Sequence, residues 1–275
     1  MGFQTLPSSD GKGDRPWWLV ALVVIGLVIA AVIAVNDLYA QVFTVIAQGL
    51  LTTVFVTLAG FVLATALGLG IALLGMSDHV VLRQTARFYV EVIRGVPILV
   101  LLFYIAFVGA PAIVGLYNLV ISPLTATGLA EPMLVRDFSL MWRAIIALMI
   151  GYSAFIAEIF RAGIQSVDKG QIEAAKSLGL NRYQRFRLVV LPQAVRVIFP
   201  PLSNDFVAMV KDSSLVSVLG VADITQMGKV YASGSFRFFE TYSIVAYVYL
   251  ILTIGLSLML RALEKRMRRH GRGAD

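Results

Sequence analysis

The chain contains no cysteine among its 275 residues. Disulfides and thiolate chemistry are therefore excluded. Charged residues are also scarce, at 14% against about 25% in soluble domains. The two histidines are far apart and lack neighbouring ligands, whereas a metal site needs three or four, so we expect no metal. The sequence has no HExxH or GxSxG motif, which argues against a membrane enzyme.

Apolar residues make up 59% of the chain and occur in long uncharged runs, which indicates an integral membrane protein. The run 17–35 is long enough to cross about 30 Å of hydrocarbon. The run 42–76 is longer, and we interpret it as a lead-in over 42–49 followed by a tilted span. Further spans are predicted over 88–108, 142–160, 194–212 and 241–260. The expected fold is an all-α, polytopic bundle of six membrane helices.

Prolines interrupt two of these regions. Pro111 and Pro123 lie in a stretch after residue 108 that we expect to form an interfacial or external loop. Pro200 and Pro201 are expected to break the helix over 194–212.

The distribution of basic residues predicts the orientation of the six spans. With both termini in the cytoplasm, 18 of the 23 Lys and Arg side chains fall on the cytoplasmic side and 5 outside. Basic loops remain cytoplasmic, so this arrangement is favoured. The net charge of +7 then reflects topology and contact with membrane lipid, and not a nucleic-acid partner. We expect a multi-pass protein of the bacterial cytoplasmic (inner) membrane.

A polar segment, 166–193, is predicted to lie in the cytoplasm as a pair of short helices. Asp168 can cap the first helix, with Gln171 three residues later as its reciprocal partner. Asn181 and Gln184 have the same spacing at the start of the second helix. Two capped starts within one loop predict a helix–turn–helix against the membrane.

The turn of this segment contains Gly179, which is expected to end the first helix, and Pro192 is expected to mark where the chain leaves the second. Ala174 and Ala175 have small side chains, so another protein surface can approach the backbone beside Glu173 closely. A solvated basic loop that only fixes topology remains the alternative.

The sequence EAAKSLG, followed by nine residues and then VVLP, resembles the EAA motif of ABC importer permeases. Val189 replaces the usual isoleucine. The stretches VIRGVPILVLLFY and VKDSSLVSVLG resemble the polar amino-acid branch of that family, over roughly residues 42–265. The matching residues of the motif, which the resemblance assigns to coupling with an ATPase, are Glu173, Ala174, Ala175, Gly179, Leu191 and Pro192.

The resemblance implies a type I importer in which this chain forms the pathway for polar or charged L-amino acids. Its partners would be a dimer of ABC ATPase subunits, a second permease (itself or a paralogue) and a periplasmic or lipid-anchored amino-acid-binding protein. No phosphate-binding loop is found here, so ATP and magnesium would bind the partner ATPase and no cofactor this chain. The implied domains are a tail 1–16, an additional span 17–40, a permease domain 41–264 that includes the coupling loop, and a basic tail 265–275.

Candidate residues for the substrate pathway are polar groups within predicted spans, where such groups are costly and often functional. Each has a plainer alternative. Glu158 can pair with Arg161, threonines can bond their own backbone, Arg94 can anchor a helix end, and the residues after Pro201 can belong to a satisfied bend. The candidates are Thr53, Thr57, Arg94, Glu158, Asn204 and Asp205.

A second set of candidates resembles the family's KDTSL pattern and is expected to form an outer gate or contact the binding protein. It comprises Lys211, Asp212, Ser213 and Ser214. Two alternatives remain open at this point. An ion-coupled secondary transporter or channel would explain the spans but not the EAA spacing. A subunit that docks the ATPase without touching substrate would explain both.

Overall fold

The computed structural model describes residues 17–269; the predicted tail 1–16 and the end of the basic tail, including His270, lie outside them. Every regular element in this range is helical. In chain order the elements are α1 (Trp17–Val35), α2 (Asp37–Ala47), α3 (Leu50–Gly75), α4 (Val80–Gly95), α5 (Ile98–Tyr104), η1 (Ile105–Gly109), α6 (Ala110–Ala126), η2 (Val135–Asp137), α7 (Leu140–Gln165), α8 (Lys169–Ser177), α9 (Arg182–Arg185), η3 (Phe186–Val190), α10 (Leu191–Asp212), η4 (Ser213–Leu219), α11 (Ile224–Ser235) and α12 (Phe238–Arg269).

Five helical segments are long and apolar enough to cross a membrane, and a shorter apolar helix precedes them over Leu19–Val35. The five are Asp37–Gly75, Ile98–Ala126, Leu140–Gln165, Arg182–Leu219 and Phe238–Met267. The predicted all-α membrane bundle is therefore confirmed. The lead-in before the second predicted span is a separate helix, α2, joined to α3 by a short turn.

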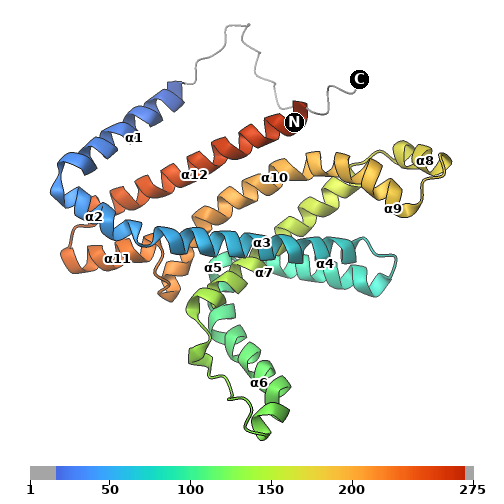
Figure 1. Cartoon of the computed structure of the whole chain (residues 1–275), viewed down its shortest axis with the longest axis horizontal. Coiled ribbons are helices and arrows are strands. Elements are labelled where there is room, and N and C mark those ends of the chain that lie inside the picture. Colours follow the sequence, from blue (N-terminus) through green and yellow to red (C-terminus); the bar gives the residue numbers. More distant parts are fainter. Residues whose placement is uncertain (1–16, 270–275) are drawn as a thin grey trace.

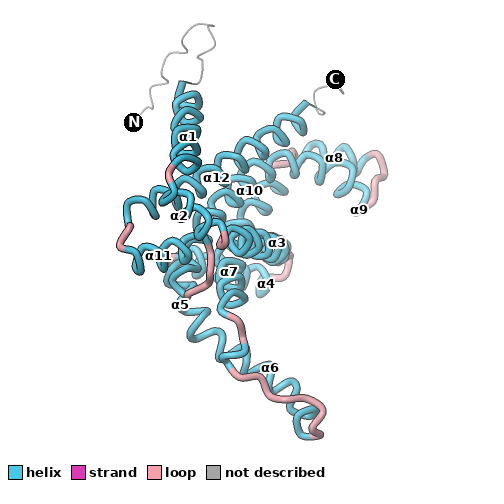
Figure 2. The backbone as a smooth tube through the Cα atoms, turned by 60° about the vertical axis from the view of Figure 1, so that its left-hand side comes forward, coloured by secondary structure: helices cyan, strands magenta, loops and turns pink. Residues whose placement is uncertain are grey.

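The prediction of a loop after residue 108 is wrong, because the chain continues as helix through η1 and α6 to Ala126. Pro111 is the second residue of α6 and lies just after the π-turn η1, which interrupts the regular α-helical hydrogen bonding where the proline lacks an N–H. Pro123 lies within the helix near its end. In both views α6 extends away from the other helices (Figures 1 and 2).

The expected break at Pro200 and Pro201 is also wrong, because α10 continues through both residues. A proline inside a helix costs about 3 kcal/mol, but helices packed around it can hold the helix together. Ile198 and Leu202 provide such packing, within an apolar cluster shared with α7. Pro192 likewise does not end a helix, since α9 continues through the π-turn η3 into α10.

Helices α3 and α7 cross closely at a glycine. A Cβ atom on Gly68 would lie 2.9 Å from the Ile156 Cγ2 atom and from the Ser153 carbonyl oxygen. Small residues permit such approaches between membrane helices. A Cβ atom on Gly70, two residues further along α3, would meet nothing within 4 Å. The close contact therefore involves one face of α3.

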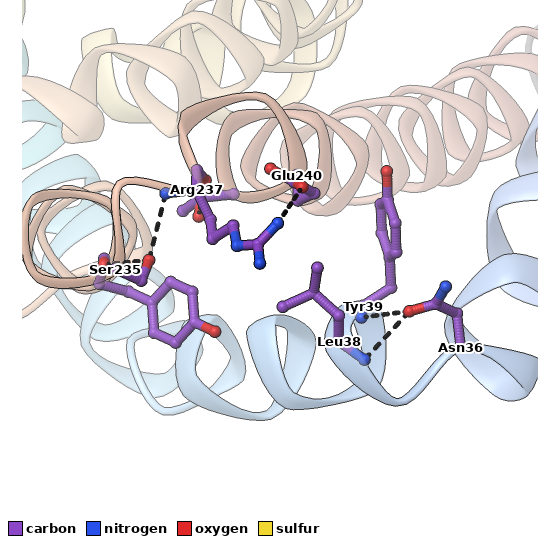
Figure 3. A network of polar contacts seen from close by, with 8 residues as sticks. Asn36, Leu38, Tyr39, Ser235, Arg237 and Glu240 are labelled. Carbon is purple, nitrogen blue, oxygen red and sulfur yellow. Dashed lines mark hydrogen bonds and ion pairs between the residues drawn. The ribbon is translucent and has the colours of Figure 1, made fainter.

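At the opposite end of the bundle from α8 and α9, α2 packs against α11 and the start of α12 (Figure 1). The Asn36 side chain accepts hydrogen bonds from the backbone N–H groups of Leu38 and Tyr39 and so caps α2. Across from it, Arg237 pairs with Glu240 at 3.5 Å in the first turn of α12 (Figure 3). These contacts fix the turns that frame this end of the molecule.

A buried carboxylate organises the start of α11. Asp223 is fully buried, accepts a hydrogen bond from the Gln226 N–H at 2.8 Å and another from the Tyr249 hydroxyl at 3.2 Å. Burial raises the pKa of Asp223 above its ordinary value, and these hydrogen bonds oppose that rise. The Ile224 N–H donates to the Thr53 hydroxyl at 3.2 Å, which ties α11 to α3.

Candidate functional site

The predicted coupling loop forms two short helices, α8 and α9, at one end of the bundle (Figures 1 and 2). Asp168 caps α8 by accepting a hydrogen bond from the Gly170 N–H at 2.7 Å. The expected reciprocal bond from Gln171 is absent in the described cap. Its side-chain oxygen instead accepts a bond from the Gln193 amide at 2.5 Å, and this amide also donates to the Val189 carbonyl oxygen. A side-chain clamp therefore connects α8 to the base of α10.

The turn between the helices has the geometry predicted for Gly179. Its φ is +77°, in the left-handed region that favours glycine. The Leu180 N–H reaches the Ala175 carbonyl oxygen at 3.2 Å and the Gly179 N–H reaches the Lys176 carbonyl oxygen at 3.0 Å, as in a Schellman motif. The reciprocal cap of Asn181 and Gln184 is present, with both bonds at 2.9 Å.

The residues of the EAA motif differ in how far their side chains are exposed to solvent. Glu173 and Ala174 are exposed, but Ala175 is only 4% exposed and packs within its own chain. Of the two alanines, Ala174 is therefore the one accessible to another surface in this chain. Sequence reasoning also missed two large side chains, Leu178 and Tyr183, which are 81% and 67% exposed. Apolar residues in so polar a loop were the available signal for a docking surface.

Leu191 and Pro192, the other members of the motif, lie on the first turn of α10. They line a groove between α10 and α12. The motif thus divides into an exposed part on α8 and a part at the base of the membrane helix.

A cavity of about 490 Å³ lies at the junction between α4 and α5. Among its lining residues are Arg94, Tyr152, Asp205 and Asp212, from α4, α7 and α10. The cavity therefore brings Arg94 together with two candidates of α10 that are more than a hundred residues away in sequence. Arg94 lies at the end of α4 and is exposed at the wall of this cavity, so its guanidinium is accessible to a ligand.

The polar groups of this cavity differ in their own partners. The Arg94 guanidinium lies 5.3 Å from the centre of the Phe155 ring. The Tyr152 hydroxyl donates to Asp212 Oδ2 at 2.7 Å and so holds that carboxylate. Asp205 Oδ2 is buried and has no hydrogen-bond partner among the described residues. Because buried polar oxygens are usually bonded, this one is available to a ligand or water.

The remaining pathway candidates lie elsewhere. Thr57 donates to the Thr53 carbonyl oxygen at 2.8 Å, the backbone bond that was the plainer alternative. Glu158 pairs with Arg161 at 2.6 Å beside a second cavity of about 400 Å³. Asn204 lines a separate cavity of about 120 Å³ with Ser257 and Arg261.

The gate candidates other than Asp212 differ in their exposure to solvent. Lys211 is exposed, and Ser214 is half-buried. Ser213 is buried and its hydroxyl donates to the Val210 carbonyl oxygen at 2.7 Å. Of this set, only Asp212 lines the cavity of Arg94.

Comparisons with known proteins assign the family. Residues 64–269 match the family described as "Binding-protein-dependent transport system inner membrane component". The chain is 38% identical over 225 residues to the "Probable amino-acid permease protein YxeN" of Bacillus subtilis, covering 82% of this chain and 92% of that protein. It is 36% identical over 221 residues to the "Glutamine transport system permease protein GlnP" of Escherichia coli, covering 80% and 92%.

Solved structures agree with this assignment. One described as "Crystal structure of an amino acid ABC transporter with histidines" matches at a TM-score of 0.67 and 36% identity, covering 82% of this chain and 96% of that one. A chain of the MetNI methionine ABC transporter, in an inward-facing conformation, shares the fold at a TM-score of 0.61 and 17% identity. By its sequence and its fold, the chain belongs to the family of binding-protein-dependent transport system inner membrane components.

Proposed function

We propose that amino acids cross the membrane along the cavity bounded by Arg94, Asp205 and Asp212. As a family member the chain is a multi-pass membrane permease of an ABC importer, a transport subunit and not an enzyme. The family implies an ATPase partner and a substrate-binding protein. The ion-coupled alternative is not favoured. The amino-acid substrate is supported by relatives named as amino-acid and glutamine permeases.

The proposal rests on one observation: the guanidinium of Arg94 and the carboxylates of Asp205 and Asp212 line the same cavity without forming ion pairs with each other. No ion pair joins Arg94 to Asp205 or Asp212 in the described part of the chain. An amino acid carries a carboxylate and an ammonium group at neutral pH. The guanidinium can bind the first in a bidentate manner, and Asp205 Oδ2, which lacks a partner, can accept from the second.

The cytoplasmic half of the proposal concerns the coupling loop. We place 166–193 against a dimer of ATPase subunits that binds ATP and magnesium, with Glu173 and Ala174 at the contact. The exposed side chains of Leu178 and Tyr183 support a docking surface, since they would otherwise be solvated apolar groups. Both termini are placed in the cytoplasm, a second permease (a copy or a paralogue) completes the pathway, and a periplasmic or lipid-anchored binding protein delivers the substrate.

The cavity is tested by the variants Arg94→Gln and Asp205→Asn in the assembled importer. Each removes one charged hydrogen-bonding group, which is worth about 1.5–3 kcal/mol, so we expect the KM for uptake to rise roughly 10- to 100-fold. Radiolabelled amino-acid uptake into vesicles, at matched expression, measures the effect. Arg136→Gln is the control, because this exposed arginine lies outside the cavity and has the same charge change. Unchanged uptake in both test variants would exclude this pathway.

A further inference from the structure

A groove between α10 and α12 carries the clearest unassigned chemistry on the described surface. Its volume is about 610 Å³, and α10 and α12 lie side by side in both views (Figures 1 and 2). Its walls are apolar side chains, including Val195 and Phe199 of α10 and Leu263 and Met267 of α12. Val195 and Leu263 are 39% and 45% exposed, so the walls are open to an occupant.

Two guanidinium groups complete the lining, one from each helix. They belong to Arg196 and Arg266, both exposed. No carboxylate lines the groove in the part of the chain that the structure describes. Glu264, two residues before Arg266, borders the separate cavity of Asn204. The groove therefore combines an apolar wall with a positive rim.

We propose that this groove binds an anionic phospholipid, with its phosphate on Arg196 and Arg266 and an acyl chain along the apolar wall. Basic pockets between membrane helices bind anionic headgroups, and arginine suits the planar geometry of phosphate contacts. The apolar wall selects a lipid over free phosphate. A second copy of this chain would bring the same two arginines to the contact and so would repel the rim.

The position of the groove connects it to transport. Leu191 and Pro192, at the base of α10 and the end of the coupling loop, also line it. A lipid bound here holds α10 and α12 together where motion of the loop would enter the membrane. Its placement in the cytoplasmic leaflet rests on the proposed orientation, but binding itself does not depend on ATP or substrate.

The test measures lipid bound to the complete importer by native mass spectrometry, with phosphatidylglycerol and phosphatidylcholine as probes. Wild-type complex is expected to retain phosphatidylglycerol in preference to phosphatidylcholine. The double variant Arg196→Gln/Arg266→Gln is expected to weaken phosphatidylglycerol binding roughly 30-fold. The matched control, Arg261→Gln/Lys265→Gln, removes the same charge from exposed residues of α12 that do not line the groove and should bind normally.

Three outcomes would overturn the proposal. These are equal retention of the two lipids, an equal loss in the control double variant, and displacement of phosphatidylglycerol by millimolar inorganic phosphate. The last would identify a simple anion site. Because the measurement uses neither ATP nor amino acid, its failure leaves the proposed transport function intact. Unchanged uptake in the cavity variants, which would exclude the proposed pathway, would likewise leave this lipid site intact.

Discussion

Gly179→Val is expected to reduce ATP-driven uptake strongly while the chain still inserts and assembles. The residue has a φ of +77°, and a Cβ there would meet no atom within 4 Å, so the entire effect arises from the backbone. A non-glycine residue in such a conformation costs about 1–3 kcal/mol, and β-branching increases the cost. The turn between α8 and α9 should relax to another angle. Because 1.4 kcal/mol is a tenfold change in population, uptake should fall at least about tenfold.

Gly179→Asn is the matched variant, because asparagine tolerates the left-handed region. It should retain most of the uptake, and both variants should show normal membrane levels on immunoblots. Equal loss in the two would indicate that an added side chain disturbs a contact directly. Normal uptake in Gly179→Val would show that the shape of the turn does not govern coupling.

Gly49→Ala should produce the largest loss of stability. Gly49 has an ordinary helical φ of −79°, but its Cβ would lie 2.3 Å from the Asp223 carbonyl carbon and 2.5 Å from the Ile224 nitrogen. Backbone atoms cannot rotate aside as a side chain can. The α2–α3 turn must therefore separate from α11, and the bond between Thr53 and the Ile224 N–H would be lost with it. Overpacking costs about 1–3 kcal/mol and occasionally more, and we expect at least about 3 kcal/mol here.

Thermal unfolding in detergent, followed by size-exclusion chromatography, measures this effect. The control is Gly234→Ala on α11, where a Cβ would meet nothing within 4 Å and helix propensity should improve slightly. A melting curve for Gly49→Ala that overlays the wild-type curve would mean that the two turns are not packed as described.

Local signals were sufficient to predict the coupling loop. Asn181 and Gln184 have a spacing that satisfies two backbone donors, and Gly179 stands where a helix must end, so residues close in sequence determine both features. The spacing of Asp168 and Gln171 carried the same signal but failed. Gln171 has a competing partner, Gln193, 22 residues away, which no local pattern contains.

Tertiary packing explains the other differences. Pro200 and Pro201 predict a break from local chemistry, but contacts with α7 hold the helix through them. The cavity could be predicted only as a set of candidates. Arg94 and Asp205 are separated by more than a hundred positions, and sequence does not show that the α4–α5 junction shares a cavity with α7 and α10.

The central claim is that α8 lies in the cytoplasm and touches an ATPase. Because the chain has no cysteine, Ala174→Cys supplies a single exposed thiol on α8. Lys229→Cys, exposed on α11 at the other end of the bundle, is the control (Figure 1). In intact cells Ala174→Cys should resist a membrane-impermeant maleimide and crosslink to the ATPase subunit in the assembled complex, whereas Lys229→Cys should be labelled and not crosslink. Labelling of Ala174→Cys from outside, or no crosslink to the ATPase, would contradict the account.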